Sequence, residues 1–305
     1  MKPQVIAMPG AEAIAERIAG KLGTTCCRLE SRRFPDGETY LRVADDVAGR
    51  DVLVVAQLRE PDPQLAGLLF MADALRELGA ASIGLVAPYL PYLRQDMRFR
   101  PGEAVTSRSF AKLVSAAFSW LVTVDPHLHR HPSLDTIYRI PSAVVPSAPA
   151  IAAWVQTQVR HPCIVGLDEE SRRWVSGVAA LAGCPHLVFE KRRDGEGDGD
   201  LILPDPSALQ GCTPVLLDAI ISSGHTMATA LQRLGGLGNA PPVCVCVHPV
   251  FAGNAAAVLQ AAGAARVVSC NTLPHASNAI DVTGALAEAV RVELEAVNAG
   301  CEDPA

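Results

Sequence analysis

Short runs of apolar residues alternate with amphipathic stretches along most of the chain. The amphipathic stretches have helical spacing, most clearly between residues 65 and 75, where leucines and an alanine share one face and Gly79 marks the end. The apolar runs are typical of buried strands, and they are Val52–Ala56, Ile83–Ala87, Leu121–Val124, Cys163–Leu167, Pro214–Leu217 and Val243–Val247. Strands that alternate with helices predict parallel sheets flanked by helices, with binding sites at the carboxyl ends of the strands.

The alternation pauses near residue 144, where Pro141, Pro146 and Pro149 lie close together, and then begins again. The chain has 305 residues, which is about two domains at roughly 150 residues each. We therefore predict an α/β protein of two tandem domains, residues 1–144 and 145–305, each a mostly parallel sheet flanked by helices. Residues 192–200, RRDGEGDGD, break the pattern with acids and glycines, and we expect an exposed, mobile loop there.

Composition and charge narrow the class of function. The formal charge is −6 and 49% of the residues are hydrophobic, which suits packed cores and lacks the basic footprint of a nucleic-acid binder. Prolines and glycines interrupt the uncharged stretch between Arg233 and Arg266, so no membrane helix of about 20 residues fits. The nine cysteines lack C-x-x-C spacing, and the N-terminus does not read as a signal peptide. We expect a cytoplasmic protein that binds neither nucleic acid nor membrane.

The segment PVLLDAIISSGHTMATAL, residues 214–231, carries the first candidate chemistry. An apolar strand runs into Asp218 and a turn of small residues, and a helix follows. Backbone N–H groups at residues 222–226 would face outward at the helix N-terminus, and Ser222, Ser223 and Thr226 add hydroxyls, so the segment can cradle a phosphate. Ordinary helix capping accounts for the same residues equally well.

This strand, acid and SSGHT loop resemble the ribose-5-phosphate loop that type I phosphoribosyltransferases share with phosphoribosyl pyrophosphate synthetases. Four further segments resemble the synthetase family, with features of its archaeal-type branch. They are RFPDGE at residues 33–38, PYLPYLRQDMRFRPGEAVTS at 88–107, VTVDPHLHRH at 122–131, and residues 165–193, which include VGLDEES and the start of FEKRRDGEGDGD. The resemblance implies two phosphoribosyltransferase-like domains of type I.

The resemblance places ATP on the first two of these segments. The implied ATP-binding residues are Phe34, Asp36, Glu38, Arg94, Gln95 and Asp96. A phenylalanine ring can stack on adenine, carboxylates can accept from its amine, and an arginine fork suits phosphate oxygens. Read alone, Pro-Asp-Gly is an ordinary turn, and the arginines around residue 94 could form a solvated surface. In the family a neighbouring subunit completes the adenine site, which implies a homo-oligomer, either a dimer or an assembly of dimers.

The last two segments would hold magnesium and the catalytic loop. Asp125 and His127 take the places of the family's metal residues, Asp168 that of an acid that binds metal or ribose hydroxyls, and Mg²⁺ is the implied cofactor. Without the resemblance, the alternating histidines at 127, 129 and 131 also suit an exposed loop or the metal cluster of a hydrolase. Lys191 and Arg193 take the two cationic positions of the flexible loop, where they would neutralise charge that develops on the transferred diphosphoryl group.

The resemblance implies that ribose 5-phosphate binds at Asp218, Ser222, Ser223, Gly224, His225 and Thr226. The loop departs from the family at three places: Ala219 replaces a second acid, Ser222 a further acid, and His225 a glycine. A missing charged hydrogen bond to the sugar costs roughly 1.5–3 kcal/mol, which is about one to two decades of binding.

The implied activity is ribose-phosphate diphosphokinase. It would transfer diphosphate from Mg-ATP to the C1 hydroxyl of ribose 5-phosphate, giving phosphoribosyl pyrophosphate and AMP. The departures in the loop leave open a weakly active or inactive regulatory homologue. A type I phosphoribosyltransferase is a third hypothesis, but it leaves RFPDGE, the RQD segment and the cationic loop without a role.

Overall fold

The computed structural model describes residues 2–192, 200–235, 237 and 240–301, and the chain forms two compact units. The first unit consists of the residues up to Val145 together with those from Thr283 onward, and the second consists of Pro146–Val282. The unit boundary therefore lies beside the predicted one at residue 144. The end of the chain differs from the predicted second domain, residues 145–305. The C-terminal helix α8 (Thr283–Cys301) belongs to the first unit, because it packs on α1 and on strands of that unit.

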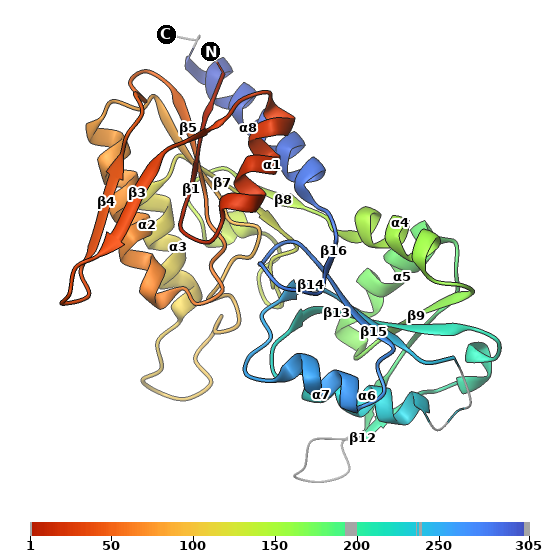
Figure 1. The fold of residues 1–305 in the computed structure, drawn as a ribbon. Coiled ribbons are helices and arrows are strands. Elements are labelled where there is room, and N and C mark those ends of the chain that lie inside the picture. The colour runs from red at the N-terminus through yellow and green to blue at the C-terminus, as the bar shows by residue number, and fades with distance from the viewer. Residues whose placement is uncertain (1, 193–199, 236, 238–239, 302–305) are drawn as a thin grey trace. The chain divides into compact units, whose positions relative to one another are not determined.

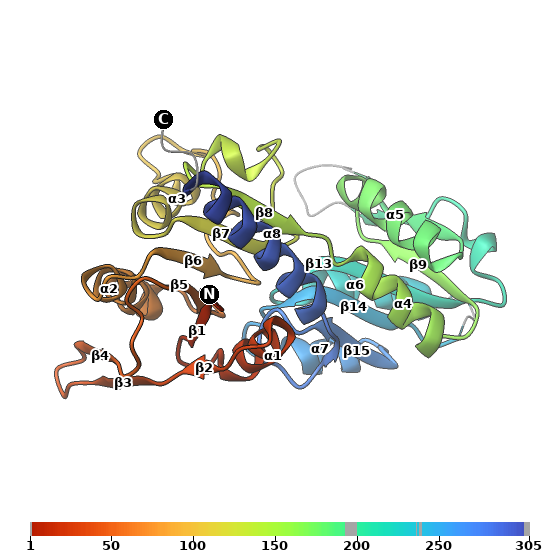
Figure 2. The same cartoon turned by 90° about the horizontal axis from the view of Figure 1, so that it is seen from above.

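The first unit is built on a six-stranded parallel sheet in the order β2-β1-β5-β6-β7-β8. Helices α1 and α8 cover one face of the sheet, and α2 and α3 cover the other (Figure 2). The strands are β1 (Gln4–Ala7), β2 (Cys26–Cys27), β5 (Asp51–Val55), β6 (Ser82–Val86), β7 (Trp120–Val124) and β8 (Ser142–Val145). The remaining helices are α1 (Glu12–Leu22), α2 (Asp62–Glu77), α3 (Thr106–Ala117) and a 3-10 turn at Leu134–Thr136.

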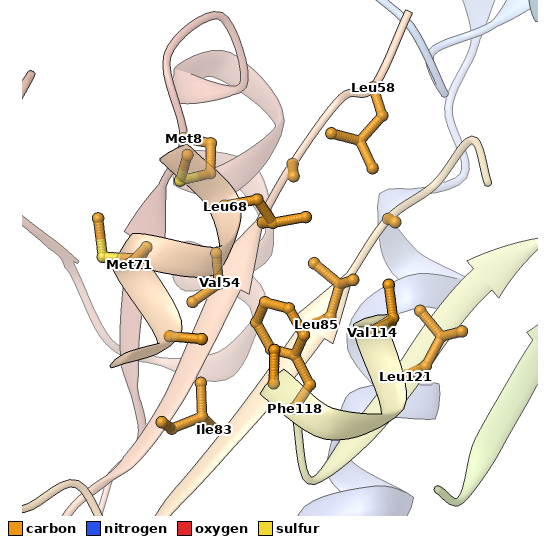
Figure 3. Close-up of a cluster of buried hydrophobic side chains, with 14 of the residues drawn as sticks. Met8, Val54, Leu58, Leu68, Met71, Ile83, Leu85, Val114, Phe118 and Leu121 are labelled. Carbon is orange, nitrogen blue, oxygen red and sulfur yellow. The ribbon is translucent and has the colours of Figure 1, made fainter. Parts of the chain in front are cut away.

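The core on the α2 and α3 face shows why the pattern of apolar residues produces this layer. Alternate residues of each strand point to the same face, and the helical leucines meet them there. Figure 3 shows Leu68 and Met71 of α2, Val114 of α3, and Ile83 and Leu85 of β6 in this cluster, all of them buried. The helix predicted around residues 65–75 is confirmed as α2, and Gly79, with φ +81°, follows its end.

Gly84 of β6 packs closely against a tryptophan on the opposite face. It is the register partner of Trp120 in β7, and the Trp120 side chain is fully buried. A Cβ atom added to Gly84 would lie 2.1 Å from Cζ2 and 2.2 Å from Cε2 of the indole. The indole therefore occupies the space above the Gly84 backbone, on the face that α8 covers.

The second unit repeats the first in topology. Its parallel sheet has the order β10-β9-β13-β14-β15-β16, with α4 and α5 on one face and α6 and α7 on the other (Figure 1). The strands are β9 (Pro162–Gly166), β10 (His186–Val188), β13 (Thr213–Ile221), β14 (Val243–Pro249), β15 (Arg266–Cys270) and β16 (Asn278–Ile280). The helices are α4 (Ala148–Gln158), α5 (Arg172–Ala182), α6 (His225–Gly235), α7 (Ala255–Ala261) and 3-10 turns at Glu169–Ser171 and Pro206–Leu209.

Each unit inserts an antiparallel hairpin at the same point, directly after its second strand. In the first unit the hairpin is β3 (Leu29–Arg33) with β4 (Thr39–Val43), and in the second it is β11 (Glu190–Arg192) with β12 (Asp200–Ile202). The predicted adenine segment and the predicted catalytic loop thus belong to topologically equivalent hairpins.

The predicted fold class, two α/β units with mostly parallel sheets, is confirmed. All six predicted strands are strands of the two sheets. Two of them run further than predicted, because β13 continues through Asp218 to Ile221 while β14 beside it continues to Pro249. Among the described residues, no helix has both the length and the apolar character needed to cross a membrane.

Candidate active site

The loop after β6 carries Arg94 and is held in place by Tyr92. Tyr92 has a φ of +65°, its hydroxyl donates a hydrogen bond to Asp62 at the start of α2, and its ring packs on Phe110 with centroids 4.9 Å apart. A non-glycine residue keeps such a backbone conformation only where its surroundings fix it. The two contacts of Tyr92 therefore define where the exposed Arg94, two residues later, leaves the loop.

Gln95 and Asp96 follow in the same loop, and both have partners in the protein. The backbone carbonyl of Gln95 accepts from the N–H of Ser107 at 3.3 Å. Asp96 is only 4% exposed, and its two carboxylate oxygens accept from Nη1 of Arg130 at 2.9 and 3.1 Å. The carboxylate of Asp96 therefore faces a neighbouring loop, and a direct contact with ATP stays a prediction.

That neighbouring loop follows β7 and holds the predicted metal residues Asp125 and His127. Asp125 has a φ of +31°, and its N–H donates to the carbonyl of Val145 at 3.2 Å, which ties the loop to β8. The ring of His127 meets the ring of His129 edge-on, with centroids 4.0 Å apart.

Burial, followed by the nearby His129 and Arg94, lowers the pKa of His127 to about 4. Asp96 and Arg130 also lie close enough to affect this pKa, so the two loops bring these side chains together. At neutral pH the imidazole is uncharged, and it keeps a lone pair that can bind a metal ion.

The predicted adenine segment forms the end of the β3–β4 hairpin. The N–H of Phe34 donates to the carbonyl of Glu38 at 2.8 Å, and Oδ1 of Asp36 accepts from the N–H of Glu38 at 3.2 Å. The guanidinium of Arg32 lies 4.4 Å from the ring centroids of both Phe34 and Tyr40. Phe34, a residue that is 39% exposed, is thereby held against an arginine.

In the second unit, Asp168 stands in a tight turn after β9. Its carboxylate accepts from the N–H of Ser171 at 2.9 Å, and its carbonyl accepts from Oγ of Ser171 at 2.6 Å. Gly166 makes this turn possible, since a Cβ atom there would lie 2.7 Å from Oγ of Ser171. Asp168 is partly buried in this position.

The predicted ribose-phosphate loop joins β13 to α6. The strand ends at Ile221, and its carbonyl and that of Ser222 accept from the N–H groups of Phe251 at 2.9 Å and Ala252 at 3.0 Å. Gly224 turns the chain with a φ of +78°, and its carbonyl accepts from Ala228 at 2.8 Å.

Helix α6 then begins at His225, so the N–H groups of its first turn have no partner within the helix. Ser223, His225 and Thr226 are exposed, while Asp218 and Ser222 are partly buried. A helix N-terminus with exposed hydroxyl and N–H groups can bind an anion, and the predicted ribose-phosphate loop lies at such a terminus.

The predicted catalytic pair is described only in part. Lys191 lies in β11, where its backbone is the register partner of Leu201, and Arg193 lies outside the described residues. The segment predicted as a loop has paired ends, because Arg192 and Asp200 are register partners. Residues 193–199 between them also lie outside the described residues.

Comparisons with known proteins agree with these observations. The family model for the N-terminal domain of ribose phosphate pyrophosphokinase matches residues 4–117. The ribose-phosphate pyrophosphokinase of Methanosarcina acetivorans is 32% identical over 289 residues, which cover 94% of this chain and 99% of that protein. This chain belongs to the ribose-phosphate pyrophosphokinase family.

Other members of the family match over a similar length. The ribose-phosphate pyrophosphokinase of Methanosarcina mazei is 33% identical over 94% of this chain and 95% of that protein, and both relatives are archaeal, as the sequence features predicted. The crystal structure of phosphoribosylpyrophosphate synthetase from Mycobacterium smegmatis shares the fold, with a TM-score of 0.84 and 24% identity over 97% of this chain and all of that one.

The described residues suit only one kind of magnesium site, in which substrate phosphates and waters supply several of the ligands. Among the described residues, no group of three or more histidine, cysteine, aspartate or glutamate side chains could hold a metal ion. Mg²⁺ does not need such a cage, because it keeps several waters and is bound by one or two protein groups together with substrate phosphates. Neutral His127, two residues after Asp125, suits a magnesium ion of this kind, carried mainly by the nucleotide.

The structure adds two arginines to the residues that the motifs predicted. Arg32 stacks on Phe34, and Arg130 pairs with Asp96. Arg130 lies within the VTVDPHLHRH segment, three residues after His127, but nothing in that segment indicates its partner.

Proposed function

We propose that this chain transfers the β,γ-diphosphoryl group of Mg-ATP to the C1 hydroxyl of ribose 5-phosphate. The observation that carries the proposal is the end-to-end match to the Methanosarcina acetivorans ribose-phosphate pyrophosphokinase, which spans both units. A phosphoribosyltransferase would use the finished donor and needs neither the hairpin residues around Phe34 nor the loop around Arg94. The products are phosphoribosyl pyrophosphate and AMP.

The reaction is a displacement at the β-phosphorus of ATP. The C1 oxygen forms the new bond to that phosphorus, the bond to the oxygen bridging the α- and β-phosphates breaks, and AMP leaves with that oxygen. The hydroxyl proton passes to solvent. Because the reacting groups carry out the bond changes themselves, the protein contributes chiefly position and charge stabilisation. Magnesium, when bound, neutralises charge on the phosphates.

The second unit provides the sugar site in this proposal. The 5-phosphate binds the N–H groups of the first turn of α6 and the hydroxyls of Ser223 and Thr226, and Ser222 and His225 extend the same cradle. Asp218, in the strand that leads into the loop, binds a ribose hydroxyl. Lys191 and Arg193 act on the transferred diphosphoryl group.

The first unit provides the nucleotide site. Phe34 stacks on adenine, Asp36 and Glu38 accept from its amine, and Arg94 and Gln95 bind the nucleotide. The hairpin serves the nucleotide site of a neighbouring subunit, so the active form is a homo-oligomer. His127 and Asp125 of this unit take part in magnesium binding, and the role proposed for Asp168, in the second unit, is also magnesium binding.

The test is AMP formation from ATP and Mg²⁺ by purified protein, with and without ribose 5-phosphate. We expect AMP only with ribose 5-phosphate, in equal amount to phosphoribosyl pyrophosphate. Binding of ATP or ribose 5-phosphate without AMP would instead indicate the regulatory homologue, and ADP as product would indicate an ordinary kinase. Consumption of added phosphoribosyl pyrophosphate with a nucleobase would indicate a phosphoribosyltransferase.

Ala219→Asp tests the sugar site at its clearest departure from the family. Ala219 is the partly buried neighbour of Asp218 in β13. A second carboxylate there is expected to lower the KM for ribose 5-phosphate about tenfold or more and to leave the KM for ATP unchanged, because a charged hydrogen bond to the sugar is worth roughly 1.5–3 kcal/mol. Ala219→Asn adds the same bulk without the charge, and an equal gain from it would contradict the role of the acid.

A further inference from the structure

The ion pair between Asp96 and Arg130 joins the two loops that follow β6 and β7. Its partners differ greatly in exposure: the Asp96 side chain is 3% exposed and the Arg130 side chain is 52% exposed. In other ion pairs of the described residues, such as that of Arg42 with Glu30, both side chains are exposed to solvent. This pair therefore has a buried anchor and an outward-facing cation.

Only one nitrogen of the Arg130 guanidinium takes part in the ion pair with Asp96. Nη1 donates to both carboxylate oxygens, at 2.9 and 3.1 Å, and the guanidinium lies 5.6 Å from the ring centroid of Phe99. The N–H groups on Nε and Nη2 take no part in the ion pair. A guanidinium carries its donors in a rigid plane, so fixing one nitrogen also fixes the direction of the others.

The position of Arg130 places these donors where the proposed nucleotide site lies. Arg130 is three residues after His127, and Asp96 is two residues after Arg94. β6 and β7 are neighbouring parallel strands, so their loops emerge side by side at the carboxyl edge of the sheet, where α/β proteins bind ligands. Arg94 and Arg130 thus bring two cations to one edge.

We infer that Arg130 binds the phosphate chain of the nucleotide and that Asp96 is its positioning residue. The inference rests on the proposed function, since it names a further contact within the same site. The buried carboxylate fixes the plane of the guanidinium. The remaining N–H groups can then donate in parallel to two oxygens of a polyphosphate. A pair that merely held the loops together would not need a half-exposed cation. Burial of the charged Asp96 side chain lowers the free energy of unfolding. The orientation of Arg130 supplies a functional reason for this burial.

The experiment compares nucleotides that differ only in phosphate number. Calorimetric Kd values for ATP and AMP are measured with the wild-type chain and with Arg130→Gln, without ribose 5-phosphate, so turnover is not required. We expect Arg130→Gln to weaken ATP binding about tenfold or more, as for a lost charged hydrogen bond, and to change AMP binding less than about twofold. Arg130→Lys keeps the charge without the fork and is expected to fall between the two.

Two more variants separate binding from structure. Arg28→Gln removes a cation of an exposed ion pair with Asp45 elsewhere in the first unit and is expected to leave both Kd values unchanged. Asp96→Asn leaves Arg130 in place but weakens its anchor, so ATP binding is expected to weaken less than in Arg130→Gln, again without an effect on AMP.

Three results overturn the inference: unchanged ATP binding in Arg130→Gln, equal losses for ATP and AMP, or a wild-type chain that binds no ATP. If Arg130→Gln does not fold, Arg130→Lys decides, because a loss confined to ATP supports the inference and any other result overturns it. The proposed function fails separately, if the wild-type chain binds ATP but forms no AMP with ribose 5-phosphate.

Discussion

Replacing Lys191 with alanine is expected to lower kcat about 10²–10³-fold and to change the KM for each substrate by less than about threefold. Removal of one preorganised group that stabilises charge in the transition state has an effect of this size. The backbone of Lys191 pairs with Leu201 in the β11–β12 hairpin, and those backbone bonds do not depend on the side chain. The measurement is steady-state AMP formation at saturating ATP and ribose 5-phosphate.

Two controls make the Lys191 result specific. Lys191→Arg retains a cation at the same position and is expected to recover part of kcat. Lys112→Ala removes an exposed lysine from the second half of α3, a residue with no proposed role in the site, and is expected to have no effect on kcat or KM. Near wild-type turnover in Lys191→Ala would contradict its catalytic role, even if AMP formation itself had been demonstrated.

The largest effect on stability is expected from Gly84→Ala. A Cβ atom at this position would lie 2.1 Å from the Trp120 indole, which is fully buried and cannot move without disturbing the face that α8 covers. Overpacking of this kind costs about 3 kcal/mol. In a unit of this size that corresponds to a fall in melting temperature of roughly 6–12 °C. The measurement is thermal unfolding, with hydrogen exchange of β6 and β7 to locate the change.

The matched control is Gly20→Ala in α1. A Cβ atom there meets nothing within 4 Å, so this change is expected to leave stability unchanged or to raise it by about 0.5–1 kcal/mol through helix propensity. Trp120→Leu should partly rescue Gly84→Ala, because it removes the ring that the new methyl group meets. Additive losses in the double variant would contradict the steric explanation.

The sheets could be predicted from the sequence because each central strand is a buried apolar run. The limit of this signal shows at β13, where Asp218 suggested the end of the strand. The strand continues to Ile221 because β14 beside it also continues, with Ile220 opposite His248 and Ile221 opposite Pro249. Pairing with a neighbouring strand overrides local polarity, and periodicity does not report it.

Contacts between segments far apart in the chain could not be predicted from the sequence, for a similar reason. The predicted second domain included residues 283–301, and nothing in the apolar pattern indicates that α8 covers the sheet of the first unit. The RQD motif assigned Asp96 to ATP, while the structure pairs its carboxylate with Arg130, 34 residues away. A motif records which residues stand together in the chain, and the direction in which each side chain points depends on the packing around it.

The return of α8 to the first unit has a consequence for the order in which the chain folds. The ribosome makes the six strands of the first sheet early, but it makes the helix that covers their Trp120 face only after the whole second unit. The second unit can complete its core while the part of the first sheet over β6, β7 and β8, on the side of α1, is still uncovered. The unit that is synthesised first is therefore the last to complete its folding. Until α8 docks, the newly made chain exposes an apolar surface that favours aggregation.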